Sequence, residues 1–170
     1  MYGPLVPFGD LHVTDSFDCG EEPLNVYLKR FAGQSEKRGG SRTFVIADRG
    51  HRVVGYYTLT VGGVEHVNAP AAVTKGMGKY PIPVIILPRL AIDKSVQSQG
   101  FGRALLKDAI KRVVFNISPH VGVRAILIHA KNTKVCDWYK KQASSFIESP
   151  TDPLHLFLLI QDIEKNSNPT

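Results

Sequence analysis

The chain has 170 residues, 43% of them hydrophobic and 21% charged, which is typical of one folded domain and excludes a disordered or fibrous protein. No apolar run approaches the ~20 residues that span a membrane, and the start of the chain, Met1–Pro7, lacks the basic region of a signal peptide and is broken by prolines. The net charge of +6 favours an anionic partner. We therefore expect a single domain over residues 1–170 in the cytoplasm, with both cysteines reduced.

The first half of the chain predicts one helix followed by strands. Pro23 suits a first helical turn, and the helix continues to Gln34 on an apolar stripe of Leu24, Leu28 and Phe31. A basic loop is expected at Glu36–Ser41. Apolar runs separated by a turn then predict two strands, and a small-residue segment predicts a short helix, at Thr43–Ala47, Val53–Val61 and Ala69–Val73.

The second half contains the clearest elements. Ile82–Ile92 predicts a strand, although its prolines interrupt the hydrogen-bond ladder. After a polar turn, an apolar stripe that starts at Phe101 and reaches Ile117 predicts a long amphipathic helix. A buried strand, a helix and a final strand with a polar tail follow at Val121–His129, Thr133–Gln142 and Leu154–Ile160. The order of elements indicates a mixed α and β fold.

The most informative segment joins the strand that ends at Ile92 to the long helix. It reads Gln97-x-x-Gly100-x-Gly102, and its glycines let the backbone approach a phosphate group without a Cβ atom in the way. A helix that starts here directs several free N–H groups and the positive end of its dipole at one small concavity. The pattern predicts a binding site for a pyrophosphate.

Two other phosphate-binding loops do not fit. A dinucleotide fold needs Gly-x-Gly-x-x-Gly with an acidic residue ~20 positions later. Here Leu105 takes the third glycine position, and no Asp or Glu occurs between Asp108 and Asp137. A Walker loop needs Gly-x-x-x-x-Gly-Lys-Ser/Thr, whereas the only Gly-Lys pair of this chain is followed by Tyr80.

The loop is similar to the coenzyme A loop of the GNAT acetyltransferase superfamily, which reads Gln/Arg-x-x-Gly-x-Gly/Ala between a strand and a helix. The rest of the chain resembles, more narrowly, GNAT toxins of bacterial type II toxin–antitoxin modules. This match runs from about Ser16 to Ile163. Its blocks occur in the same order as in the relatives: Ser16–Gly20, Leu24-Asn25, Arg42–Val45, Val54–Tyr57, Ile82–Val84, Arg89–Asp93, Gly122–Ala125 and Ser149-Pro150.

The resemblance implies a fold of the α/β (α+β) class with a central mixed, mostly antiparallel sheet, a splayed strand pair and flanking helices. It implies an acetyl-CoA-dependent N-acetyltransferase that acetylates the α-amino group of an aminoacyl-tRNA and so blocks translation. It also implies a homodimer that a ribbon-helix-helix antitoxin neutralises. Through that antitoxin, the toxin would bind DNA and repress its own operon.

The resemblance also assigns roles to single residues. Asn132 would bond the coenzyme where the two strands splay, and Tyr139 matches the catalytic tyrosine. The pantetheine arm would pair with the backbone of Leu90, Ala91 and Ile92. The pyrophosphate would lie on Gln97, Ser98, Gln99, Gly100, Phe101, Gly102, Arg103 and Ala104. The chain departs from its relatives at Pro88, where they usually have a small residue, and in the longer segment after Tyr139.

The chemistry can be argued from the residues themselves. A tyrosine with a pKa of about 10 can donate a proton to a thiolate whose conjugate acid has a pKa of about 8.5, and Tyr139 is the candidate. The only acid on the strand is Asp93 at its very end, where a cap is the expected role. An α-amino group, with a pKa of about 7.7–8.0, is partly neutral without a base, whereas lysine is not. The missing glutamate therefore favours an α-amine as acceptor.

Five basic residues are candidates for contact with tRNA. An arginine within an apolar strand must be paired or line a cleft, so Arg89 is expected to face the acceptor. Weaker candidates are Lys29, Lys37, Arg38 and Arg42. The six histidines show no spacing typical of a metal site, and we expect none. Two alternatives stay open: an acetyltransferase for a protein N-terminus or small amine, and a non-catalytic partner in a DNA-bound repressor complex.

Overall fold

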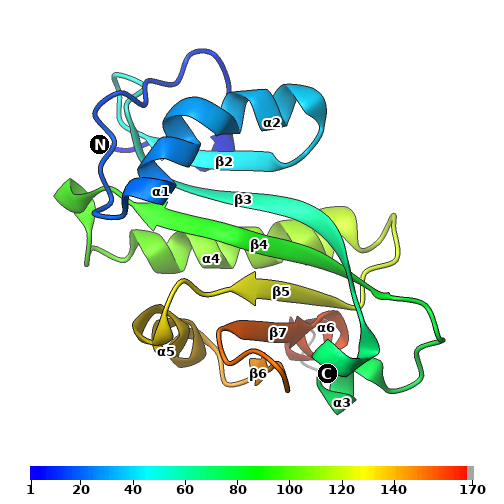
Figure 1. Cartoon of the computed structure of the whole chain (residues 1–170). Helices are drawn as coiled ribbons and strands as arrows, with labels where there is room; N and C mark the ends of the chain where they lie inside the picture. The colour runs from blue at the N-terminus through cyan, green and yellow to red at the C-terminus, as the bar shows by residue number, and fades with distance from the viewer. Residues whose placement is uncertain (168–170) are drawn as a thin grey trace. The chain divides into compact units, whose positions relative to one another are not determined.

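A computed structural model describes residues 1–167, and its strands form a mixed sheet in the order β1-β2-β3-β4-β5-β7-β6 (Figure 1). The β4–β5 pair is parallel, while β1–β2, β2–β3, β5–β7 and β6–β7 are antiparallel. The predicted fold class, a mostly antiparallel sheet flanked by helices, is confirmed. The strands are β1 Val6–Pro7, β2 Arg42–Ala47, β3 Val53–Val64, β4 Ile82–Ile92, β5 Ala125–His129, β6 Ile147–Glu148 and β7 His155–Leu159.

The helices differ from the prediction mainly in length. The α-helices are α1 Glu22–Val26, α2 Ala32–Arg38, α3 Ala71–Thr74, α4 Phe101–Arg112, α5 Thr133–Gln142 and α6 Ile160–Ser167. Two π-helical turns, Tyr27–Phe31 and Val113–Ile117, follow α1 and α4, and 3-10 turns form at His66–Asn68 and Lys94–Val96.

Several predicted boundaries were wrong. The predicted basic loop after Gln34 is still helical as far as Arg38, because Gly39, with φ of 71°, ends α2 only there. The strand predicted from Val121 begins at Ala125. The polar tail is helical as α6, and its last residues, 168–170, lie outside the described part of the chain.

Contacts divide the chain into two compact units, of which the first comprises residues 1–60 and 89–109. In this unit, the helix from α1 to α2 packs on β2 (Figure 1). The core between them is built from Phe17, Leu28, Ala32, Val45, Val53, Tyr56 and Ala91. Along β2, Thr43, Val45 and Ala47 alternate on one face and are buried, and Ile46 on the other face is buried as well.

The second unit comprises residues 61–88 and those from 110 onward. Its core joins β4, β5 and β7 to α3 through Val64, Ala69, Val73, Ile82, Val84, Ala125, Leu127, Phe157 and Leu159. Arg124 holds the end of α3: its guanidinium donates hydrogen bonds of 3.0–3.1 Å to the carbonyls of Val73, Ala72 and Lys75. These carbonyls would otherwise be the unpaired acceptors of a helix end.

The β4–β5 ladder explains the unusual Pro88. Registered pairs run from Val84 with Ala125 to Leu87 with Ile128, and β4 continues past this ladder to Ile92. Pro88 follows the last paired residue, so its missing N–H falls where the ladder has already ended.

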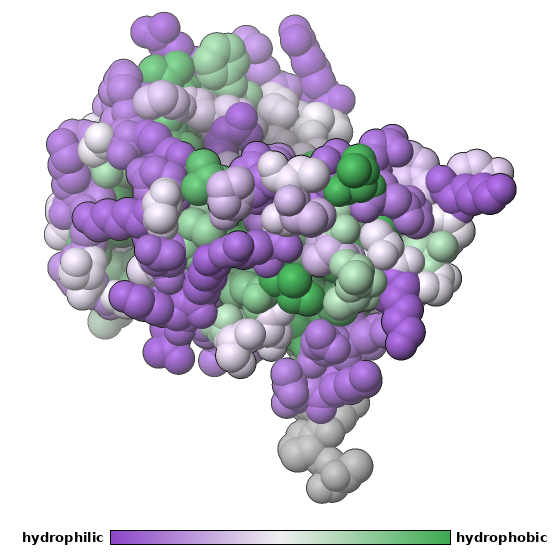
Figure 2. Space-filling view, turned by 60° about the horizontal axis from the view of Figure 1, so that its bottom comes forward, coloured by the Kyte–Doolittle hydropathy of each residue, from purple (hydrophilic) through white to green (hydrophobic). Residues whose placement is uncertain are grey.

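One face of the molecule shows mainly polar side chains. The face drawn in Figure 2 is mostly hydrophilic, with hydrophobic residues scattered between polar ones. Within residues 1–167, no helix is both long and apolar enough to cross a membrane.

Candidate active site

The loop between β4 and α4 is fixed at its start by Asp93. One carboxylate oxygen accepts the Ser95 amide at 2.9 Å and the Ser95 hydroxyl at 2.6 Å, while the other accepts the Asp18 amide at 2.9 Å. Burial raises the pKa of Asp93, but these hydrogen bonds outweigh it and the pKa lies below its ordinary value. Asp93 is the expected cap, although a buried one, and its occupied oxygens leave it poorly placed to act as a base.

Asp18 ties the loop to the N-terminal segment. Its carboxylate lies 2.9 Å from Lys94 Nζ, its carbonyl accepts the Lys94 amide at 2.8 Å, and its carboxylate also accepts the Gly20 amide. These contacts, led by the hydrogen bond from Lys94, lower the pKa of Asp18 to about 2. No local pattern in the sequence signals this role, because Asp18 and Lys94 are far apart in the chain.

Gln97 shapes the loop from within. Its side-chain amide donates to the carbonyl of Cys19 at 3.0 Å and to that of Ile92 at 2.9 Å. Both of its side-chain N–H groups are therefore used by the protein. Gln97 can contribute its backbone amide and its side-chain oxygen to a ligand.

The next residues expose a set of backbone donors. Ser98 and Gly100 have positive φ angles of 62° and 87°, and no atom lies within 4 Å of where a Cβ of Gly100 would be. Such left-handed residues curve successive N–H groups into a concavity that fits an anion. The first hydrogen bond of α4 is donated by Ala104 to Gly100, so the amides from Gly100 to Arg103 have no partner within the helix. The loop fits a pyrophosphate.

The end of β4 carries the remaining predicted residues of the first unit. Ala91 is buried, and Leu90 and Ile92 are half-buried. The Arg89 guanidinium carbon lies 3.7 Å from the centroid of the Tyr27 ring, which is a cation–π contact. Tyr27 is held in turn by a 2.8 Å hydrogen bond to Ser41. The sequence did not single out Tyr27.

In the second unit, α5 carries the other two candidates. Asn132 caps this helix: its side-chain oxygen accepts the Val135 amide at 2.9 Å, so that its NH₂ group is the part left for a ligand. Tyr139 is 4% exposed and packs edge-on against Trp138 and Phe146. Burial alone raises the pKa of Tyr139, which keeps its hydroxyl protonated. Phe146 lies in the segment after Tyr139 that differs from the relatives, and its ring still packs against the tyrosine.

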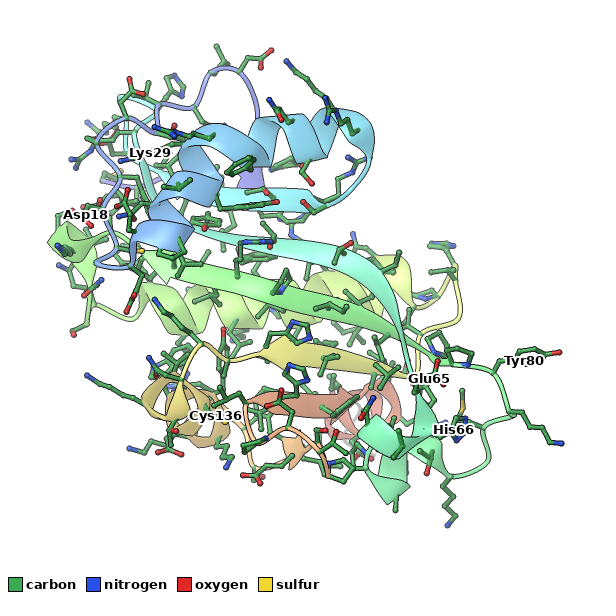
Figure 3. All side chains as sticks on the ribbon, viewed as in Figure 1. Asp18, Lys29, Glu65, His66, Tyr80 and Cys136 are labelled. Carbon is green, nitrogen blue, oxygen red and sulfur yellow. The ribbon has the colours of Figure 1, made fainter. Side chains whose placement is uncertain are left out.

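The other tRNA candidates of the first unit lie on the helix from α1 to α2 and on β2. Lys29, Lys37 and Arg38 are exposed, and Lys29 can be followed in Figure 3. Arg42 is partly used by the protein, because it donates to the Glu36 carbonyl at 2.8 Å and lies 3.8 Å from the Glu36 carboxylate.

Other reactive side chains have structural partners. The Cys136 thiol (Figure 3) donates to the Pro153 carbonyl at 3.4 Å, and burial raises the pKa of this thiol. Within residues 1–167, no three His, Cys, Asp or Glu side chains are grouped to hold a metal. One open cavity of about 500 Å³ in the second unit contains none of the predicted site residues and is lined by Glu65, His66, Val67, Met77, Gly78 and Lys79.

Comparison with known proteins places this geometry in a family. Residues 10–143 match the Acetyltransferase (GNAT) family. A tRNA-acetylating toxin of Mycobacterium tuberculosis is 46% identical over 153 residues, which cover 90% of this chain and 89% of that toxin.

Two solved structures are also similar. AtaT in complex with acetyl-methionyl-tRNAfMet has a TM-score of 0.87 at 29% identity, with 97% of this chain and 99% of AtaT covered. A tyrosine-to-phenylalanine mutant of KacT has a TM-score of 0.86 at 31% identity, with 96% of this chain and 98% of KacT covered. The resemblance found in the sequence is confirmed, and the chain belongs to the GNAT acetyltransferase family.

Proposed function

We propose that this protein is a toxin that transfers the acetyl group of acetyl-CoA to the α-amino group of an aminoacyl-tRNA and so stops translation. The observation that carries the proposal is the open start of α4, where the amides from Gly100 to Arg103 have no partner within the helix. Its support is the 46% identity to a tRNA-acetylating toxin over most of both chains.

The first unit holds the coenzyme in this proposal. The amides between Gln97 and Ala104, at the positive end of the α4 dipole, bind the pyrophosphate. The β4 edge from Leu90 to Ile92, which extends past the β4–β5 ladder, offers its backbone groups to the pantetheine arm. Asn132 of the second unit adds its NH₂ group. Acetyl-CoA supplies the thioester, and no metal is needed.

Tyr139 supplies the proton for the leaving group. The neutral α-amine attacks the thioester carbonyl, the C–N bond forms, the C–S bond breaks, and Tyr139 protonates the departing thiolate. The proton that the amine loses passes to water, and solvent reprotonates the tyrosine. The raised pKa of Tyr139 suits a group that must be protonated before each turnover.

A weakly basic acceptor fits the absence of a free carboxylate on β4. Both oxygens of Asp93 already accept hydrogen bonds from Ser95 and Asp18. An α-amine is partly neutral near pH 7 and needs no base, whereas a lysine amine of pKa about 10.4 does. This difference favours aminoacyl-tRNA, which is found in the cytoplasm, over protein lysines. Arg89, Lys29, Lys37, Arg38 and Arg42 would contact the RNA.

Solved relatives suggest further partners. AtaT has been solved with the C-terminus of the antitoxin AtaR, and KacTA has been solved with DNA. We propose that the present chain likewise binds an antitoxin, of the ribbon-helix-helix type, and through it DNA. A homodimer of the toxin would fit a palindromic operator.

The test is acetylation with labelled acetyl-CoA in the presence of total charged tRNA, total protein and small amines. We expect label in RNA that is released when the tRNA is deacylated, and no label with the Tyr139→Phe variant. Label only in protein or in small amines would refute the tRNA substrate. A Tyr139→Phe variant that inhibits growth as strongly as the wild type would favour the non-catalytic role in a repressor complex.

A further inference from the structure

The helix from α1 to α2 contains a π-helical turn that changes which residues face the solvent. In an uninterrupted α-helix, Phe31 lies three residues after Leu28 and shares its buried face. Here the Ala32 amide donates to the Tyr27 carbonyl, five residues back. Ala32 is completely buried beside Leu28, while Phe31 is 51% exposed. The apolar stripe predicted from the sequence was therefore wrong at Phe31.

The exposed phenylalanine lies among positive charges. Lys29, Arg30, Lys37 and Arg38 are all exposed on this helix. The only acid between residues 29 and 38 is Glu36, which is half-buried, accepts the Thr43 amide at 3.0 Å and lies 3.8 Å from Arg42. The surface formed by Lys29, Arg30, Phe31, Lys37 and Arg38, here called the helix surface, is thus basic with an aromatic ring in it.

From this arrangement we propose that Phe31 is a stacking platform for an unpaired base of the tRNA, with the adjacent cations on the flanking phosphates. Every base has a π face, and exposed aromatic rings within basic surfaces bind single-stranded nucleic acid by stacking. A lone exposed apolar residue needs no explanation. Here, however, a π turn directs Phe31 outward, and π turns occur frequently at functional sites. The proposal rests on tRNA being the substrate.

The cationic side chains and the Phe31 ring contribute differently to RNA binding. Lys29 and Arg30 contribute through release of counterions, so their loss weakens the salt dependence of RNA binding. Stacking by Phe31 releases no counterions, so its loss lowers affinity at every salt concentration equally. This difference separates a base contact from a general electrostatic one.

The experiment measures kcat/KM for aminoacyl-tRNA at several salt concentrations. We expect Phe31→Ala to lower it about 10-fold with an unchanged salt slope, and Phe31→Trp to retain it. The Lys29→Gln/Arg30→Gln double variant should reduce the slope by about two. Leu11→Ala removes a 75% exposed apolar residue of the same unit and should change nothing. KM for acetyl-CoA should stay the same in all variants.

A second measurement does not depend on catalysis. The tryptophan introduced by Phe31→Trp should lose fluorescence when uncharged tRNA binds, beyond the change that Trp138 gives in the wild type. The kinetic measurements are then repeated with an aminoacylated acceptor-stem minihelix as substrate. If Phe31 stacks on a base at the 3′ end, the effect of Phe31→Ala persists with the minihelix; if the base lies elsewhere in the tRNA, the effect is lost.

The proposal that Phe31 stacks on a tRNA base would be overturned by a wild-type kcat/KM in Phe31→Ala or by no added quenching in Phe31→Trp. It would also be overturned if Phe31→Ala changed only the inhibition by the antitoxin, because this surface would then bind protein. If the wild type acetylates no charged tRNA, the proposed function fails, while the quenching result still decides whether Phe31 meets RNA.

Discussion

Helices α4 and α5 each follow a strand, but the hydrogen bonding of their first backbone amides differs. The start of α5 is capped by Asn132, whose side chain accepts the Val135 amide at 2.9 Å. The start of α4 follows Gly100, which has no side chain to offer, and the amides of its first turn have no partner within the helix. A capped start stabilises the helix, whereas an open start keeps its donors for a ligand. The comparison predicts binding at α4 and chemistry on α5.

The largest effect is expected on α5. Tyr139→Phe removes the proton donor but keeps the ring that packs on Trp138 and Phe146, so kcat should fall about 100-fold or more. KM for acetyl-CoA and the melting temperature should stay near those of the wild type. Steady-state kinetics and thermal unfolding check this. An unchanged kcat would remove Tyr139 from the mechanism.

Gly100→Ala tests the open start of α4. With φ of 87°, an alanine strains the loop by about 1–2 kcal/mol and displaces the amides, so the Kd for acetyl-CoA should rise about 10-fold. Gly39→Ala is the matched control, because Gly39 has φ of 71° and equally open surroundings. Both variants should lose similar stability, and calorimetry should find weaker acetyl-CoA binding only for Gly100→Ala. Equal affinities would contradict the loop assignment.

Two substitutions of Asn132 separate its role as a helix cap from its proposed role in coenzyme binding. Asn132→Ala should lower the free energy of unfolding by about 1 kcal/mol, because the Val135 amide loses its acceptor. Asn132→Asp keeps the acceptor and removes the NH₂ group. Denaturant unfolding should find this variant nearly as stable as the wild type. If Asn132 also binds the coenzyme, the Kd of Asn132→Asp for acetyl-CoA should rise nonetheless.

The smallest effect concerns pH and the anchor of the α4 loop. The Lys94 hydrogen bond lowers the pKa of Asp18 to about 2, whereas an unfolded Asp has a pKa of about 3.9. The folded state therefore gains stability from Asp18 above pH ~4 and loses it as the pH falls through about 2. Thermal unfolding of Asp18→Asn and wild type should differ above pH 4 and converge near pH 2. A constant difference would show that Asp18 acts independently of its charge.

Residue patterns within short segments were sufficient to predict the elements that carry the motifs of the family. The apolar run defined β4 with both of its observed ends, and the Thr133–Gln142 pattern defined α5. The glycines at 100 and 102 predicted the coenzyme loop, and Gly100 has the left-handed backbone that glycine favours, with φ of 87°. These features depend on neighbours within a few positions, and a sequence records such neighbours directly.

The tertiary structure decided the features that depend on distant partners. The helix has a π turn at Tyr27–Phe31 and leaves Phe31 exposed, although helical spacing alone predicts that Phe31 shares the buried face of Leu28. Arg89 meets Tyr27, and Asp18 anchors the loop at Lys94, across long separations in the chain. The two-residue strands β1 and β6 exist only because longer strands pair with them. The sequence alone thus determined the family and its loop, while folding decided which side chains surround it, because contacts between remote segments leave no local pattern.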